Sequence, residues 1–208
     1  MYNRVITEMS SPSRKLEALW RWKGLNRPSF EYSEVAPYLE DAKELCDEIE
    51  GGVPDRPVHD ITAAFVELRD RMTNDGPLSP SSTVIVTPQF LLHLADSDGE
   101  YSGRFPILDV MVARAYRTRT EQDPKRTLQY SLTGSRASYR ELVEYFLHNC
   151  ETSRQVAYLE RALFVQGRAI GRYQSIQSGD EREYTEVGKI PVSGALSYLK
   201  AIEHHTQL

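Results

Sequence analysis

The feature that most constrains the fold is a helical repeat of apolar residues, which recurs through most of the chain. Its clearest example begins after Ser33, a residue type that often caps helix N-termini, and stops at Gly51 and Gly52. Apolar side chains between these points recur three or four residues apart, as they do along one face of a helix. The stripe contains Val35, Tyr38, Leu39, Ala42, Leu45, Cys46 and Ile49. This pattern predicts a helix from Ser33 to Glu50.

The same periodicity predicts helices elsewhere in the chain. In the first half of the chain we expect helices over 13–23, from a cap at Asp60 to just before Thr73, and over 88–94. In the second half we expect one from Pro106 to about Arg117, one that Ser138 opens, and one that Ser153 opens, with breaks considered at Gly167 and Gly171. A last helix would hold Ala195 to Ile202. The β-branched run 83–87 also fits a strand, and we favour helix there. About seven or eight helices with few strands predict an all-α fold.

Composition narrows the function classes. A chain of 208 residues with 40% hydrophobic residues is long enough for one core, so we expect a single helical domain over residues 1–208. No run approaches the roughly 20 apolar residues of a membrane helix, and the first residues lack the apolar stretch of a signal peptide. We therefore expect a cytoplasmic protein with no membrane partner.

Resident metals and cofactors are not expected. Cys46 and Cys150 are too few for an all-cysteine zinc site or a four-cysteine iron–sulfur cluster, and we expect both to be buried and reduced. The five histidines never form the His-Glu-x-x-His pattern of zinc hydrolases. Phosphate-binding glycine-rich loops and dinucleotide fingerprints are also absent from the sequence.

Charge is unevenly distributed along the chain. The net charge of −5 argues at first against a nucleic-acid partner. Residues 1–100, however, carry 10 basic and 18 acidic side chains, a net −8, whereas residues 101–208 carry 15 and 12, a net +3. The basic excess lies in 114–140 and 154–172. Such segments can be solvated helix faces or a surface that binds phosphates, and both interpretations stay open.

One stretch of sequence carries a family resemblance. It runs from Gln89-Phe90-Leu91-Leu92-His93-Leu94 to Arg104-Phe105-Pro106-Ile107-Leu108-Asp109-Val110-Met111-Val112-Ala113-Arg114-Ala115. A second part lies in Tyr139 to Leu147 and Leu159 to Arg168. Together these parts, spanning about 85–170, resemble the helix-hairpin-helix DNA glycosylase superfamily, and more narrowly bacterial proteins with an 8-oxoguanine-glycosylase-type fold. In that superfamily a proline, an apolar residue and an aspartate place the catalytic carboxylate at a helix start; here two apolar residues separate Pro106 from Asp109.

The resemblance implies a DNA-repair hydrolase that acts on double-stranded DNA with a modified or damaged base. Asp109 would be the catalytic residue. The base pocket would contain Gln89, Phe90, His93 and Phe164. DNA would be contacted by Arg104, Arg114, Arg117, Arg119, Lys125 and Arg126.

Departures from the family pattern limit this expectation. Family members with lyase activity use a hairpin lysine as a Schiff-base nucleophile, and Gln89 occupies the corresponding place, so lyase activity is not expected. The glycine-rich, phosphate-binding hairpin is not recognisable, and the cluster cysteines of some members are absent. The alternative is a catalytically inactive helical module that binds nucleic acid or a protein partner. Asp109 would then only cap its helix.

Overall fold

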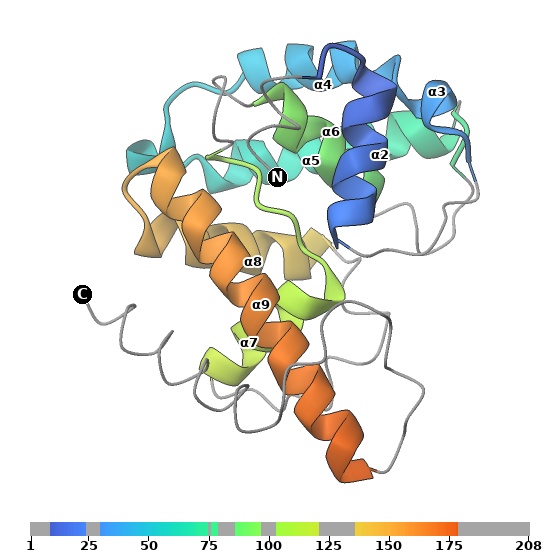
Figure 1. Ribbon diagram of the computed structural model, residues 1–208. Coiled ribbons are helices and arrows are strands. Elements are labelled where there is room, and N and C mark those ends of the chain that lie inside the picture. The colour runs from blue at the N-terminus through green and yellow to red at the C-terminus, as the bar shows by residue number, and fades with distance from the viewer. Residues whose placement is uncertain are drawn as a thin grey trace. The chain divides into compact units, whose positions relative to one another are not determined.

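In a computed structural model, the described part of the chain is helical and contains no strand (Figure 1). The structure describes residues 9–23, 30–74, 76–78, 86–96, 103–120 and 136–178. The helices are α2 (Pro12–Lys23), α3 (Tyr32–Val35), α4 (Tyr38–Asp47), the 3₁₀ turn η1 (Val53–Asp55), α5 (Val58–Asn74), α6 (Val86–Ala95), α7 (Val110–Arg119), α8 (Arg136–Asn149) and α9 (Ser153–Ser178). The all-α prediction is confirmed for these residues. Within the run 83–87, Val86 and Thr87 are helical, as favoured, and residues 83–85 lie outside the described part of the chain. The helix expected around 195–202 also lies outside it.

The helix predicted from Ser33 to Glu50 is interrupted, so that prediction was wrong in two respects. Helix α3 ends at Val35 and α4 begins at Tyr38, because Pro37 has no N–H to continue the helical hydrogen bonds. The N-terminal cap is Glu31 rather than Ser33. The backbone N–H of Glu31 donates to Oε2 of Glu34 at 2.8 Å, which is the return bond of a capping box.

Pro106 was also wrongly predicted to begin a helix. Residues 105–109 have no regular secondary structure, and α7 begins only at Val110. Asp109 determines this start, because its side chain accepts hydrogen bonds from the first turn of α7. Asp60 and Ser138 likewise lie inside α5 and α8 rather than at their caps, because these helices begin two residues earlier, at Val58 and Arg136.

The chain divides into two units. Unit 1 is Met1–Leu108 with Ser131–Tyr158, and unit 2 is Asp109–Tyr130 with Leu159–Leu208. In unit 1, α4 packs against α5 and α6, and α5 also packs against α8. The ring of Phe65 on α5 lies 4.4 Å, centroid to centroid, from that of Tyr139 on α8, and both side chains are fully buried. The expectation of one domain over 1–208 stays a prediction.

Unit 2 brings the backbones of α7 and α9 into close contact. A Cβ atom placed on Gly167 would overlap the backbone carbonyl oxygen of Met111, so only glycine fits there. A Cβ on Gly171 would overlap the guanidinium of Arg114 in the same way. Helix α9 continues through both glycines. The breaks considered at these two residues are therefore not present, and the glycines serve close packing instead.

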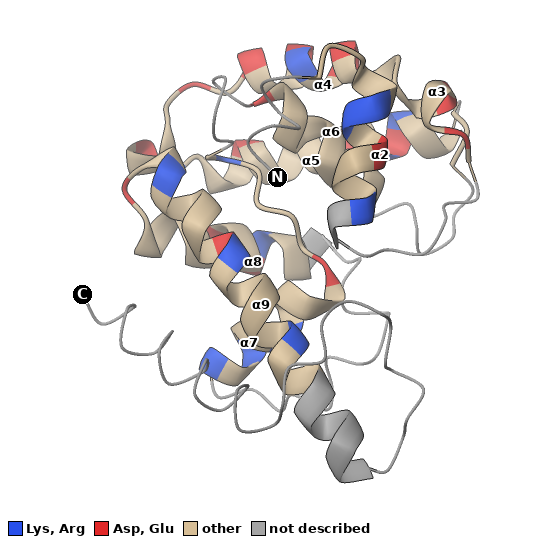
Figure 2. Cartoon of the chain, in the orientation of Figure 1, with Lys and Arg blue, Asp and Glu red and all other residues tan. Residues whose placement is uncertain are grey.

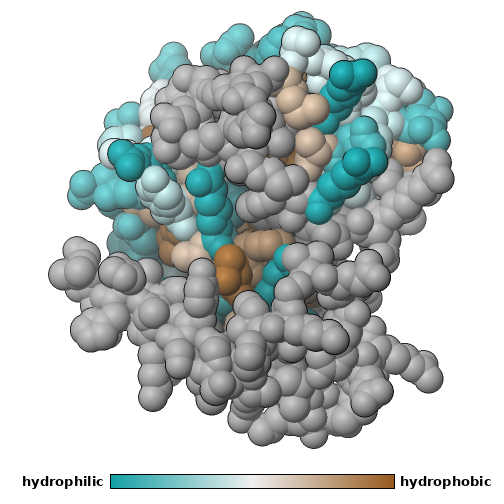
Figure 3. All heavy atoms as spheres, in the orientation of Figure 1, coloured by the Kyte–Doolittle hydropathy of each residue, from teal (hydrophilic) through white to brown (hydrophobic). Residues whose placement is uncertain are grey.

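Both cysteines are free and buried, as expected. Within the described residues, no helix is long and apolar enough to cross a membrane. The same residues include no group of three or more His, Cys, Asp or Glu side chains arranged to hold a metal ion. In the face drawn in Figure 3, hydrophilic side chains predominate among the coloured residues, with smaller apolar areas between them.

Candidate functional site

Asp109 is the N-terminal cap of α7. Its backbone is extended, with φ −110° and ψ 174°, and its carboxylate accepts hydrogen bonds from the N–H groups of Met111 at 2.8 Å and Val112 at 2.9 Å. Both bonds fall on the same oxygen, Oδ1. The side chain is 4% exposed. A carboxylate at this end of a helix interacts favourably with the first N–H groups and with the helix dipole.

The residues before Asp109 form an approach segment, residues 103–108, which is buried over most of its length. Leu108 is held by Gln89 of α6, because its backbone N–H donates to Oε1 of Gln89 at 2.5 Å. An N–H donor needs an acceptor, so this contact fixes which end of the Gln89 amide is oxygen. Gln89 has no exposed surface, and its Nε2 has no hydrogen-bond partner among the described residues.

His93 holds the approach segment one helical turn further along α6. Its Nδ1 lies 2.9 Å from the backbone oxygen of Phe105, and since a carbonyl oxygen only accepts, Nδ1 carries the proton. His93 is 1% exposed. Phe90 is fully buried in the core of unit 1, where its ring packs edge to face against Trp20 with centroids 5.6 Å apart.

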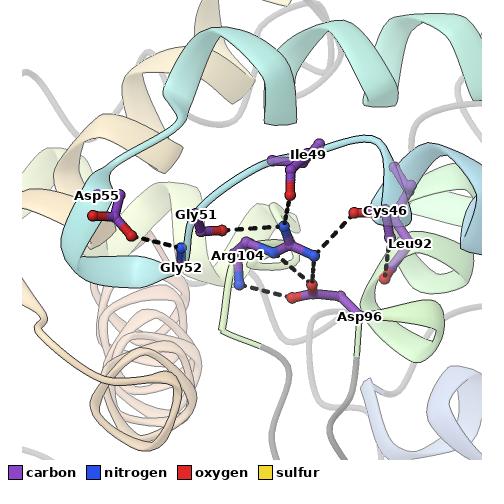
Figure 4. A network of polar contacts seen from close by, with 8 residues as sticks. All are labelled: Cys46, Ile49, Gly51, Gly52, Asp55, Leu92, Asp96 and Arg104. Atoms are coloured by element: carbon purple, nitrogen blue, oxygen red, sulfur yellow. Dashed lines mark hydrogen bonds and ion pairs between the residues drawn. The ribbon is translucent and has the colours of Figure 1, made fainter.

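Arg104 begins the approach segment and is bound on several sides (Figure 4). Its guanidinium pairs with Asp96 at 2.6 Å, and its backbone N–H donates to the other oxygen of that carboxylate at 2.9 Å. The same guanidinium donates to the carbonyl oxygens of Cys46, Ile49 and Gly51, at and beyond the C-terminal end of α4. Cations at helix C-termini stabilise unpaired carbonyl groups. We therefore interpret Arg104 as a structural residue rather than a DNA contact.

Arg114 also has a structural position. It is 2% exposed and donates from Nη1 to the carbonyl oxygen of Gly167 at 3.2 Å and to the sulfur of Met111 at 3.5 Å. A buried guanidinium cannot meet a phosphate without leaving these partners. We therefore interpret Arg114, like Arg104, as a structural residue rather than a DNA contact.

The other expected DNA contacts lie at or beyond the end of α7. Arg117 and Arg119 occupy its last turn and are half-buried, and Nε of Arg119 donates to Oε1 of Gln166 on α9 at 2.8 Å. Lys125 and Arg126 lie outside the described residues. Phe164, expected in the base pocket, is 5% exposed, with the guanidinium of Arg168 5.2 Å from its ring centroid.

The structure does not bring the four expected pocket residues together as one described group. Gln89, Phe90 and His93 belong to unit 1, and Phe164 belongs to unit 2. The base pocket therefore stays a prediction.

In the described part of unit 2, the carboxylates are buried and several arginines are partly exposed. Its described segments, 109–120 and 159–178, contain six arginines and two carboxylates. Both carboxylates, Asp109 and Glu160, are buried, at 4% and 3% exposure, whereas Arg117, Arg161 and Arg168 are half-buried. The charge that this part of unit 2 presents is accordingly cationic, and blue positions mark it along α7 and α9 in Figure 2.

In unit 1, the segment from α3 to α5 carries a net negative charge. Residues 30–74 contain 12 acidic and four basic side chains. On α4 and the residue after it, Glu40, Glu44, Asp47 and Glu48 are exposed (Figure 2). A polyanion would be repelled there and attracted to the arginines of unit 2.

Sequence reasoning missed several of these roles. Asp96 gave no signal as the partner of Arg104, because no local pattern in the sequence pairs two residues eight positions apart outside a helix. Glu160 of α9 is buried, which was not predicted. Its position on the same face of α9 as Phe164 and Gly167, four and seven residues later, is a signal that could have indicated burial.

No protein-family model, curated protein or solved structure matches this chain.

Proposed function

We propose that this protein binds DNA through the arginines of unit 2 and hydrolyses the N-glycosidic bond of a damaged or modified base with Asp109. The observation that carries the proposal is the charge arrangement of unit 2. Its two described carboxylates are buried and its half-buried charges are arginines, on a chain whose net charge is −5. Such a distribution suits contact with a phosphate backbone.

The chemical role of Asp109 follows from its charge and position. When an N-glycosidic bond breaks, positive charge develops on the sugar, and a fixed carboxylate can stabilise that charge or orient the attacking water. The hydroxyl of water then bonds to the sugar carbon, and its proton goes to the departing base. The hydrogen bonds from Met111 and Val112 hold the carboxylate in one orientation. Pre-orientation of this kind lowers the cost of reaching the transition state.

Hydrolysis without strand cleavage is the expected outcome. Lyase chemistry needs an amine that forms a Schiff base with the sugar, and an amide nitrogen such as that of Gln89 is not nucleophilic enough to do so. The product would be an intact strand with an abasic site, which alkali then cleaves.

The test is base release from duplexes that contain oxidised, alkylated or otherwise modified bases, followed by alkali to reveal abasic sites. Asp109→Asn is the decisive variant, because asparagine keeps the helix cap and removes the charge. We expect at least a 100-fold loss of base release with unchanged DNA affinity. Equal rates for Asp109→Asn and wild type would contradict the assignment.

A DNA-binding module without catalysis is the second candidate. The observation that favours it is that capping α7 already accounts for the burial and both N–H bonds of Asp109. This candidate predicts salt-dependent DNA binding and no base release from any duplex. Affinity that does not change with salt would contradict both candidates and favour a protein partner.

A further inference from the structure

Three polar side chains bind the backbone of the approach segment from one side. These α6 anchors are Gln89, His93 and Asp96, with Asp96 directly after the end of the helix. Their spacing of four and then three residues places them on one helix face. Each meets a different backbone group of the approach segment, at residues 108, 105 and 104. The anchors thus replace the regular hydrogen bonds that this extended stretch lacks.

We propose that the α6 anchors are positioning residues for Asp109. The catalytic part of this inference rests on the proposed function. An N-cap needs an extended backbone, and Asp109 has one at φ −110° and ψ 174°. The peptide that joins Leu108 to Asp109 begins at the residue that Gln89 holds. Restricting Leu108 therefore restricts the direction from which the chain enters the cap.

Burial supports this role for Gln89 and His93 over direct contact with a base. Their side chains are 0% and 1% exposed, and each already bonds to the approach segment. Without Oε1 of Gln89, the buried N–H of Leu108 would lose its acceptor, and an unsatisfied buried group costs about 1–3 kcal/mol. The approach segment would then move away from α6 and would no longer hold the backbone of Asp109 in the orientation that caps α7.

Hydrogen exchange of single amides tests the proposal without needing activity. Gln89→Met removes the acceptor at nearly constant volume, and Gln89→Glu keeps an acceptor oxygen at the same place. We expect exchange in Gln89→Met to be about five- to tenfold faster at Leu108 and also at Met111 and Val112, the amides that Asp109 caps. Gln89→Glu should restore wild-type rates. Gln155→Met is the matched control, because Gln155 accepts from the N–H groups of Glu151 and Thr152 in a different part of the chain.

Two results would overturn the proposal. In the first, Leu108 exchanges faster and the capped amides of α7 keep their wild-type rates. In the second, hydrogen exchange at Leu108, Met111 and Val112 becomes faster only by the same factor as exchange at amides inside α4, which indicates that the whole protein is destabilised. If Gln89→Met does not fold, hydrogen exchange at the same amides is measured in His93→Leu, which removes the donor to Phe105. His93→Asn is its control, since an asparagine amide can donate to the backbone oxygen of Phe105 as Nδ1 of His93 does.

Kinetics separate this proposal from the proposed function. If wild-type protein releases a base, Gln89→Met should lower kcat about five- to tenfold with KM unchanged, and Gln89→Glu should recover the rate. If wild-type protein releases none, the proposed function fails, and the exchange rates at Met111 and Val112 still decide whether the anchors position Asp109.

Discussion

At the residue scale, Asp109 combines a structural role that the geometry shows with a chemical role that we propose. The two roles respond differently to substitution. Asp109→Ala removes the cap and should lower the free energy of unfolding by about 1 kcal/mol, whereas Asp109→Asn should stay within a few tenths of wild type. Urea unfolding measures both values. Equal stability of the alanine variant and the wild type would show that the bonds to Met111 and Val112 contribute little.

Gly167 is a second residue whose role can be tested alone. Gly167→Ala would place a methyl group against the backbone of Met111, so α7 and α9 would have to separate. We expect a loss of about 1–3 kcal/mol in thermal or urea unfolding, as for overpacked cores. Gly52→Ala is the control, because its added Cβ would lie 3.6 Å from the nearest atom. A Gly167→Ala variant as stable as Gly52→Ala would argue against the close contact.

Because of the buried thiols, the free energy of unfolding should depend on pH in the alkaline range. Burial raises the pKa of Cys46 to about 12, with the nearby Asp96 charge as a smaller cause, and burial raises the pKa of Cys150 to about 11. Above pH 9 the unfolded chain releases thiol protons that the folded protein keeps. The free energy of unfolding should therefore fall between pH 9 and 11, by up to about 1.4 kcal/mol per pH unit for each thiol. The Cys46→Ala, Cys150→Ala double variant should show a shallower decline, and an identical slope would contradict this account.

At the element scale, Arg104 joins the end of α4 to the residue after α6. Its side chain and that of Asp96 are 17% and 5% exposed, so water screens the pair little. Removing one partner of a buried pair leaves an uncompensated charge. Arg104→Met should cost about 3–5 kcal/mol in urea unfolding. The double variant with Asp96→Leu should recover part of that loss, and additive losses would show that the pair does not act as a unit.

At the scale of the whole molecule, the separation of charge predicts how DNA binding responds to salt. Arg117→Gln and Arg168→Gln should each reduce the slope of log affinity against log salt by about 1, because each removes one phosphate contact. Arg71→Gln is the control, since Arg71 lies among Asp41, Glu44 and Glu67 in unit 1. Fluorescence anisotropy with a duplex from about 50 to 200 mM salt measures the slopes. An equal effect of all three variants would contradict the assignment to unit 2.

Most helices could be predicted from the sequence because apolar periodicity and capping residues are local features of the chain. Apolar periodicity, together with Ser153, predicted α9, and the helix predicted over 13–23 matches α2, which begins one residue earlier and ends at Lys23. The misplaced starts have local reasons too. Pro37 interrupts a periodic stripe that continues on both sides of it, and Asp109 caps α7 although Pro106 offered an earlier start. Periodicity reports which face is buried, whereas the first hydrogen bond of a helix depends on one cap.

By itself the sequence determined the helical class of the described residues, and it indicated that both cysteines are buried and that Asp109 lies near the start of a helix. Only the tertiary structure decided which charges are available. Arg104 and Arg114 carry the same charge as Arg117 in the sequence, yet their guanidinium groups are bound to Asp96 and to the carbonyl oxygen of Gly167. The physical reason is that a charge's function depends on its burial and its partners, and both arise from residues far away in the chain.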